Sequence, residues 1–118
     1  MGRLQMKRVY EAAAGDDGCR VLVDRLWPRG ISKEKAALAL WARDIAPSKE
    51  LRSWYGHDPD KFAEFAGRYR AELDGNPKTA DFRTFVSEKL QEGNVTFLYG
   101  AKDGAVSNAA VLLEYLTR

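Results

Sequence analysis

Two short, largely apolar segments mark candidate buried strands, and the first is a run of consecutive apolar residues. One is Val21–Val23, within the stretch Arg20–Leu26, and the other is Val95–Tyr99. Short uninterrupted apolar runs are typical of strands that are covered on both faces of an α/β sheet. A further strand is predicted over Met6–Ala12. The stretch Gly15–Gly18 that follows it has the Gly and Asp composition of a turn.

Apolar residues spaced three and four apart predict two long helices. One begins at Asp58–Pro59 and ends near Leu73, before Gly75, and the other begins at Asn76–Pro77 and ends at Gly93. In each, a polar cap followed by proline is a helix-start signal, and glycine marks the end. Each helix has one apolar stripe that faces a core: Phe62, Phe65, Ala66, Tyr69 and Leu73 in the first, and Phe82, Phe85, Val86 and Leu90 in the second.

Serine caps predict three shorter helices. Ser32 precedes residues 33–38, Ser48 precedes a helix that carries Leu51 and Trp54, and Ser107 precedes the last helix, whose Val111, Leu112 and Tyr115 face inward. The stretch 40–46 is compatible with a third strand or with an irregular crossing, and its pattern does not choose between them.

Strands that alternate with helices predict an α/β fold with a small, mostly parallel sheet flanked by helices on both faces. The 118 residues suit one domain, and no internal repeat or long linker divides them. We therefore expect a single domain over residues 6–118. Residues 1–5 are predicted to be a flexible extension, with the folded part starting at Met6.

Composition excludes several classes of protein. Hydrophobic residues make up 45% and charged residues 31%, which is typical of a soluble globular protein. No apolar run approaches the roughly 18 residues of a membrane span, and no signal peptide is present, so a cytoplasmic location without a membrane partner is expected. Cys19 is the only cysteine, which excludes an intramolecular disulfide and fits a reducing compartment. The oligomeric state is not predicted.

Charged residues follow both buried strands. Asp24, Arg25 and Arg29 come after the first, and Lys102 and Asp103 come after the second. In open α/β sheets, ligands bind outside the carboxyl ends of the strands. A helix start such as that at Ser107 favours an anion, and arginine suits a bidentate grip on phosphate or carboxylate. We therefore expect the three cations to converge near Ser107, with Asp24 and Asp103 orienting them or acting as acid and base.

Each of these residues also has a purely structural interpretation. Asp24 and Arg25 are compatible with an ion pair that only fastens a loop, and Trp27 with core packing as well as with stacking on a ligand ring. His57, the only histidine, is compatible with proton transfer near neutral pH or with a bond to a nearby carbonyl. The sequence leaves these alternatives open.

Several familiar mechanisms lack their residues. The loop 100–106 after the last strand contains no cysteine, and Cys19 lies at the opposite edge, which excludes thiolate catalysis. One histidine and one cysteine cannot supply the usual zinc ligands, so no metal is predicted. P-loop, dinucleotide-binding and serine-hydrolase motifs are absent, and no cofactor is predicted.

Three segments resemble the YeaO-like family of bacterial proteins, whose domain has no assigned function. They are VLVDRLWPRG (21–30), the run from Trp41 through DIAPS and ELRSW to HDP, and VTFLYGAKD (95–103) with Asn108. The likeness covers about Met6 to Leu116 and implies a compact cytosolic α/β protein, without implying an activity, a cofactor or a substrate. The pattern matches at Asp24, Arg25, Trp27, Pro28, Arg29, Gly30, Asp44, His57, Asp58, Tyr99, Lys102, Asp103 and Asn108.

The sequence is compatible with three functions. The first is a module that binds a small anionic, phosphate-bearing ligand through Arg25, Trp27, Arg29, Lys102, Ser107 and Asn108. The second is an enzyme at the same site, with Asp24 or Asp103 as general base and His57 as acid. The third is nucleic-acid binding, because residues 20–35 carry five cations against two anions, although the whole chain has a net charge of only +2.

Overall fold

The chain forms one four-stranded parallel sheet with five α-helices, in a computed structural model that describes residues 1–118. The strands are β1 (Leu4–Arg8), β2 (Cys19–Leu22), β3 (Leu40–Trp41) and β4 (Val95–Tyr99), in the spatial order β1-β4-β2-β3. The helices are α1 (Lys33–Ala36), α2 (Lys49–Tyr55), α3 (Phe62–Gly75), α4 (Lys78–Glu92) and α5 (Asn108–Leu116). The predicted α/β class and parallel sheet are confirmed. No helix is both long and apolar enough to cross a membrane.

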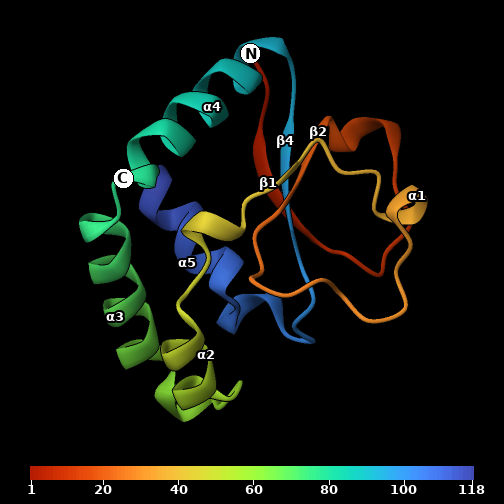
Figure 1. Cartoon of the computed structure of the whole chain (residues 1–118). Helices are drawn as coiled ribbons and strands as arrows, with labels where there is room; N and C mark the ends of the chain where they lie inside the picture. The colour runs from red at the N-terminus through yellow and green to blue at the C-terminus, as the bar shows by residue number, and fades with distance from the viewer.

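The helices cover the two faces of the sheet unequally. Figure 1 shows α3, α4 and α5 on one side of the sheet and the single-turn helix α1 on the other. Alternate residues of the central strands face each side, as the pleat of a strand requires. Val21, Val23, Phe97 and Tyr99 belong to the large core cluster on the side of the long helices. A smaller cluster on the other side contains Val9, Leu22 and Leu98 and is covered by Trp27, Leu38 and Trp41.

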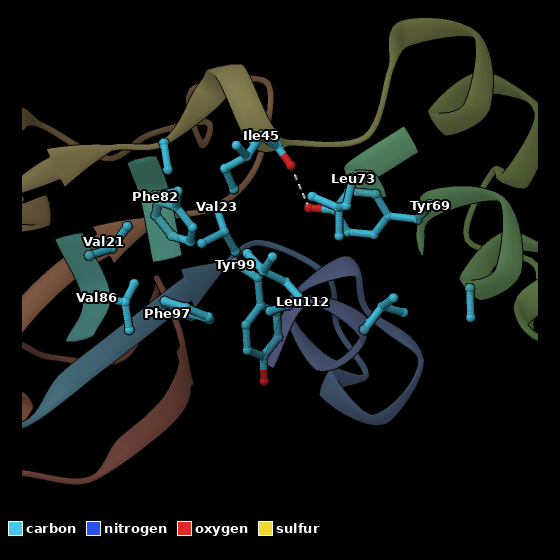
Figure 2. Packing of buried hydrophobic residues seen from close by; sticks show 14 of the residues in the cluster. Val21, Val23, Ile45, Tyr69, Leu73, Phe82, Val86, Phe97, Tyr99 and Leu112 are labelled. Atoms are coloured by element: carbon cyan, nitrogen blue, oxygen red, sulfur yellow. Dashed lines mark hydrogen bonds between the residues drawn. The ribbon is translucent and has the colours of Figure 1, made fainter. Parts of the chain in front are cut away.

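A side chain of the large core also holds the mostly irregular stretch 40–46 in place. The hydroxyl of Tyr69 on α3 is fully buried and donates a hydrogen bond of 2.7 Å to the carbonyl of Ile45 (Figure 2). Ile45 ends a 3₁₀ turn, Arg43–Ile45, that directly follows the two-residue strand β3. The stretch 40–46 is therefore partly a strand and partly an irregular crossing.

The helix caps agree with the sequence signals. Ser32, Ser48 and Ser107 each accept a hydrogen bond from the third backbone N–H of their helix. Asp58 caps a 3₁₀ turn over Pro59–Lys61, and α3 continues from it. The pattern therefore placed the helix starts correctly, because caps are local features.

The first strand differs from its prediction at both ends. It covers Leu4–Arg8 instead of Met6–Ala12, and Leu4 and Gln5 pair with Val95 and Thr96 of β4. The boundary that assigned residues 1–5 to a flexible extension is therefore wrong at Leu4 and Gln5. The physical reason is the parallel partner β4, whose full length of Val95–Tyr99 is matched by five residues of β1.

Candidate functional site

A cleft of about 220 Å³ opens beside the carboxyl ends of β2 and β4, where open α/β sheets bind ligands. Most of its lining comes from three segments that are distant in sequence, with Pro47, and Phe65 of α3, in addition. The three segments are the loop 24–28 after β2, the end of α2 with His57, and the segment from Gly100 to the start of α5. The lining includes Asp24, Arg25, Trp27, Pro47, Arg52, Tyr55, His57, Phe65, Gly100, Ser107 and Asn108.

Asp24 is the only carboxylate that lines this cleft. Its Oδ2 accepts a hydrogen bond of 2.9 Å from the N–H of Gly100, which fastens the end of β2 to the end of β4. It has no ion-pair partner. Burial raises the pKa of Asp24 above its usual range, although the Gly100 N–H and the side chain of Asn108 act in the opposite direction. Asp24 therefore fastens the two strand ends together and also presents a carboxyl group to the cleft.

Arg25 lines the cleft without an ion pair. Its Nε donates a hydrogen bond of 2.9 Å to the carbonyl of Pro47, which holds the half-buried side chain in place. The predicted ion pair between Asp24 and Arg25 is absent. The two terminal nitrogens of Arg25 have no protein partner and remain available as donors.

Arg52 is a second cleft arginine, and the sequence analysis did not single it out. It lies in the last turn of α2, and its Nε is buried without a hydrogen-bond partner. A buried donor without a partner costs about 1–3 kcal/mol and requires an explanation. The only sequence signal was its position within the segment ELRSW (50–54) of the family resemblance.

His57 lies at the mouth of the cleft, on the loop after α2. Gly56 and His57 both have left-handed backbone conformations, with φ of 54° and 59°. A non-glycine residue pays for this conformation in strain, although histidine adopts it more readily than most residues. The side chain is exposed and hydrogen-bonds to no protein group, so the predicted structural bond to a nearby carbonyl is absent.

Two further predicted residues line the cleft with their polar atoms already engaged. Trp27 donates from Nε1 to the carbonyl of Ile31 at 2.7 Å and packs edge-on against Trp41. Ser107 accepts from Ala110 and donates to Gly104, so its hydroxyl serves the start of α5. Trp27 and Ser107 therefore act mainly as walls of the cleft.

Asn108 also lines the cleft, at the first position of α5. Its Nδ2 donates to the carbonyl of Val23 at 3.0 Å, which ties the helix start to the end of β2. Its side chain also lowers the pKa of Asp24, against the effect of burial. Asn108 is therefore a positioning group for the carboxylate.

Lys102 and Asp103 line a different depression. This outer basin, of about 560 Å³, shares His57, Gly100 and Ala101 with the cleft. Asp103 caps the 3₁₀ turn Gly104–Val106 by accepting from Ala105 at 3.0 Å. The cleft itself thus contains Asp24 and His57 but not Asp103.

Arg29 is exposed and lines neither depression. The expected convergence of Arg25, Arg29 and Lys102 on one pocket is therefore not what the structure shows. Arg29 stands between Pro28, which lines the cleft, and Gly30, which has a positive φ of 74°. The arginines that line the cleft are Arg25 and Arg52.

Other reactive groups lie away from the cleft. Cys19 begins β2, at the opposite end of the sheet, and burial raises the pKa of its thiol, which disfavours the nucleophilic thiolate. No three side chains of His, Cys, Asp or Glu lie close enough together to hold a metal ion. The groups available for chemistry in the cleft are thus one carboxyl, one imidazole and two guanidinium groups.

Comparison with known proteins identifies relatives over nearly the whole chain. The family model described as the inactive DUF488-N3 subclade matches residues 3–118. The uncharacterized protein Rv3073c of Mycobacterium tuberculosis is 45% identical over 114 residues, which cover 97% of this chain and 93% of the relative. The uncharacterized protein YeaO of Escherichia coli is 40% identical over 113 residues, which cover 96% of each chain. No solved structure matches.

The predicted resemblance to YeaO is confirmed by this extent and identity. The match is not confined to the quoted motifs, because it includes β1 and the two long helices as well as the cleft. The chain therefore belongs to the YeaO-like proteins of the inactive DUF488-N3 subclade.

Proposed function

We propose that this protein is a binding module for a small anionic, phosphate-bearing molecule, which it holds in the cleft. The observation that carries the proposal is that Arg25 and Arg52 line one cleft and neither forms an ion pair. The one carboxyl of the cleft, Asp24, feels the charge of Arg52, which lowers its pKa against the larger effect of burial. Guanidinium groups are the protein donors best matched to phosphate and carboxylate oxygens. A bound anion also supplies a nearby negative charge for Arg52, whose Nε has no partner in the protein.

The remaining lining suits a small molecule. Trp27, Tyr55 and Phe65 provide apolar walls, and the few polar groups converge from separate elements, as in typical ligand sites. Asp24 does not oppose an anion strongly, because its raised pKa makes the carboxyl easier to neutralise when a second negative charge enters.

A binding role is favoured over catalysis by the name of the subclade, which describes it as inactive. The cleft also contains no serine or cysteine nucleophile with an adjacent base, since the Ser107 hydroxyl is committed to the start of α5. The cleft arrangement is therefore one that can recognise an anion without transforming it.

A second candidate is acid–base catalysis at the same cleft. It is favoured by one observation, that Asp24 and His57 both line the cleft and neither has an ion-pair partner. Asp24 is the better placed of the two predicted carboxylates, because Asp103 lies in the outer basin. Its raised pKa also makes Asp24 a stronger base than an ordinary aspartate. Chemical conversion of a bound ligand by the wild type, and its loss in Asp24→Asn, would establish this candidate in place of simple binding.

The binding proposal is tested by calorimetric titration with inorganic phosphate and ribose 5-phosphate. Arg25→Gln and Arg52→Gln should each weaken binding about tenfold, the effect expected when a charge-assisted hydrogen bond is lost. Arg3→Gln is the matched control, because Arg3 is an exposed arginine beside the start of β1, at the opposite edge of the sheet. Equal weakening by Arg3→Gln, or wild-type affinity in both cleft variants, would contradict the proposal.

Arg29→Gln tests whether the affinity for the anion comes from the cleft or from the exposed loop that carries Arg29. If the cleft binds the anion, this variant keeps wild-type affinity, because Arg29 lines neither depression. A short DNA duplex titrated at low salt provides the nucleic-acid arm. Duplex binding that weakens steeply with salt and in Arg29→Gln would support the nucleic-acid alternative instead.

A further inference from the structure

Beyond the cleft lies the outer basin, which contains a second group of unused polar and aromatic side chains. It is lined by Arg8, Tyr10, Lys102 and Asp103, among others. Arg8 and Tyr10 lie at the end of β1, so the basin extends the site towards the edge of the sheet. The cleft and the basin share His57, Gly100 and Ala101, which makes them adjacent parts of one surface.

Gly100 forms the junction between the two depressions. A methyl group placed on its Cα would lie 3.4 Å from Oδ2 of Asp24 and 4.0 Å from Cε2 of Tyr10. Glycine therefore leaves open the space between the carboxylate of the cleft and the aromatic ring of the basin. Its backbone N–H meanwhile orients Asp24.

Tyr10 offers an aromatic ring to the basin. The residue is 43% exposed, so its ring is accessible to a ligand in the basin. The guanidinium of Arg8 lies 4.8 Å from the centre of its ring, and Nε of Arg8 donates to the carbonyl of Ala101 at 3.0 Å. The arginine thus covers the ring on one side and is itself anchored to the junction.

We infer that the cleft and the outer basin form one bipartite site, whose ligand carries a planar ring in addition to its anionic group. The anion lies between Arg25 and Arg52, and the ring stacks on Tyr10. Stacking on an exposed aromatic side chain is a general way to bind a heterocyclic base without reading its edges. A nucleoside monophosphate has both parts. This inference rests on the proposed function, because it assigns the second half of the same ligand.

Two ligands that differ only in the ring test the inference. Adenosine 5′-monophosphate should bind at least about fivefold more tightly than ribose 5-phosphate, the lower end of the effect expected from one stacked base. Tyr10→Ala should remove this advantage and leave the affinity for ribose 5-phosphate unchanged. Tyr10→Phe should retain it, because the ring remains. Tyr10 is exposed, so both variants keep the core intact.

A matched control comes from a second arginine–tyrosine pair. Arg83 lies 5.4 Å from the ring of Tyr115, away from both depressions. Tyr115→Ala, the same substitution as Tyr10→Ala, should leave both affinities unchanged. If ribose 5-phosphate binds and the adenine ring adds nothing, or if Tyr10→Ala weakens both ligands equally, the bipartite site is overturned while the anion site stands. If neither ligand binds at the cleft arginines, the proposed function fails as well.

Discussion

Two buried or half-buried carboxylates, Asp17 and Asp24, have opposite electrostatic surroundings. Burial acts to raise the pKa of both. At Asp17 this effect is outweighed by the backbone N–H of Ala14 and by the side chains of Lys7 and Arg20, so its pKa is lowered. Asp24 has no ion-pair partner, and its pKa is raised. Their contributions to stability therefore depend on pH with opposite signs.

Asp24→Asn should make the protein more stable relative to the wild type as the pH rises. The folded-state pKa of Asp24 lies above the ordinary value of 3.8, so the folded chain holds this proton more tightly than the unfolded chain. The wild type therefore loses stability as the pH rises from about 4 through the raised pKa. Asparagine keeps an acceptor for the Gly100 N–H and does not ionise. Urea unfolding from about pH 4 to about pH 7 measures the difference, and a growing advantage of the wild type would contradict it.

Asp17→Asn is the control with the opposite sign. The lowered pKa of Asp17 means that its stabilising contribution is present above the ordinary value of 3.8 and is lost as the pH falls through the folded-state pKa. At neutral pH this variant should lose about 3 kcal/mol, because it leaves the buried Arg20 without its carboxylate. The loss should shrink on acidification.

Ala37→Gly should stabilise the protein by about 0.5–1 kcal/mol, because Ala37 ends α1 in a left-handed conformation that glycine adopts without strain. Its φ and ψ are 47° and 51°, and its side chain is exposed, so no packing is lost. Ala63→Gly, at an exposed position inside α3, should instead cost about 1 kcal/mol. Chemical denaturation measures both values. A loss of stability in Ala37→Gly would contradict the prediction, because it would show that glycine relieves no strain at this left-handed position.

At the scale of elements, the sequence predicted best those strands and helix starts that are determined by local interactions. Val95–Tyr99 was predicted residue for residue, since a five-residue, largely apolar segment bounded by Gly93-Asn94 and Gly100 is too short for a helix and suits a buried strand. The serine caps were equally local. The limits of β1 were missed because they are set by pairing with β4, which lies about 90 residues away in the chain.

Leu4→Ala tests the corrected start of β1. Leu4 pairs with Val95 and packs against the large core, so its truncation should cost about 1–2 kcal/mol, less than a fully buried leucine because the side chain is half-buried. Arg3→Ala, the exposed neighbour, should cost less than about 0.5 kcal/mol. Equal stability of both variants in urea would support a flexible extension through residue 5.

The residues of the candidate site differ in the same way. Some could be identified from their neighbours in the sequence, and others depend on how distant elements pack together. Asp24 and Arg25 could be selected from sequence because they directly follow an apolar run. Arg52 could not, since its place in the cleft depends on how α2 docks against the rest of the fold. Arg29 was selected as a cation in the loop after the same run, but its side chain is exposed and does not line the cleft.

At the scale of the whole molecule, the cleft joins segments that no single secondary-structure element connects. The loop 24–28, the end of α2 with His57, and the segment 100–108 meet only there. Hydrogen bonds already link the first to the third, through Asp24 with Gly100 and through Asn108 with Val23. The end of α2 is tied to the segment before α5 by the hydroxyl of Tyr55, which donates to the carbonyl of Val106 at 2.6 Å. A ligand held by Arg25 and Arg52 adds a direct bridge between the first two segments.

Ligand binding should therefore protect all three segments together. At a ligand concentration about 100 times Kd, binding to the folded state adds about 2.7 kcal/mol, which for a chain of this size corresponds to a rise in Tm of roughly 10 °C. Amide hydrogen exchange with bound adenosine 5′-monophosphate should slow in residues 24–28, 52–57 and 100–108 and remain unchanged around Cys19, at the opposite end of the sheet. Arg52→Gln, which should bind about tenfold more weakly, should roughly halve the rise in Tm at the same ligand concentration. It should also reduce the protection by one common factor in all three segments, because one bound molecule protects them together. Protection confined to a single segment would place the ligand outside the cleft.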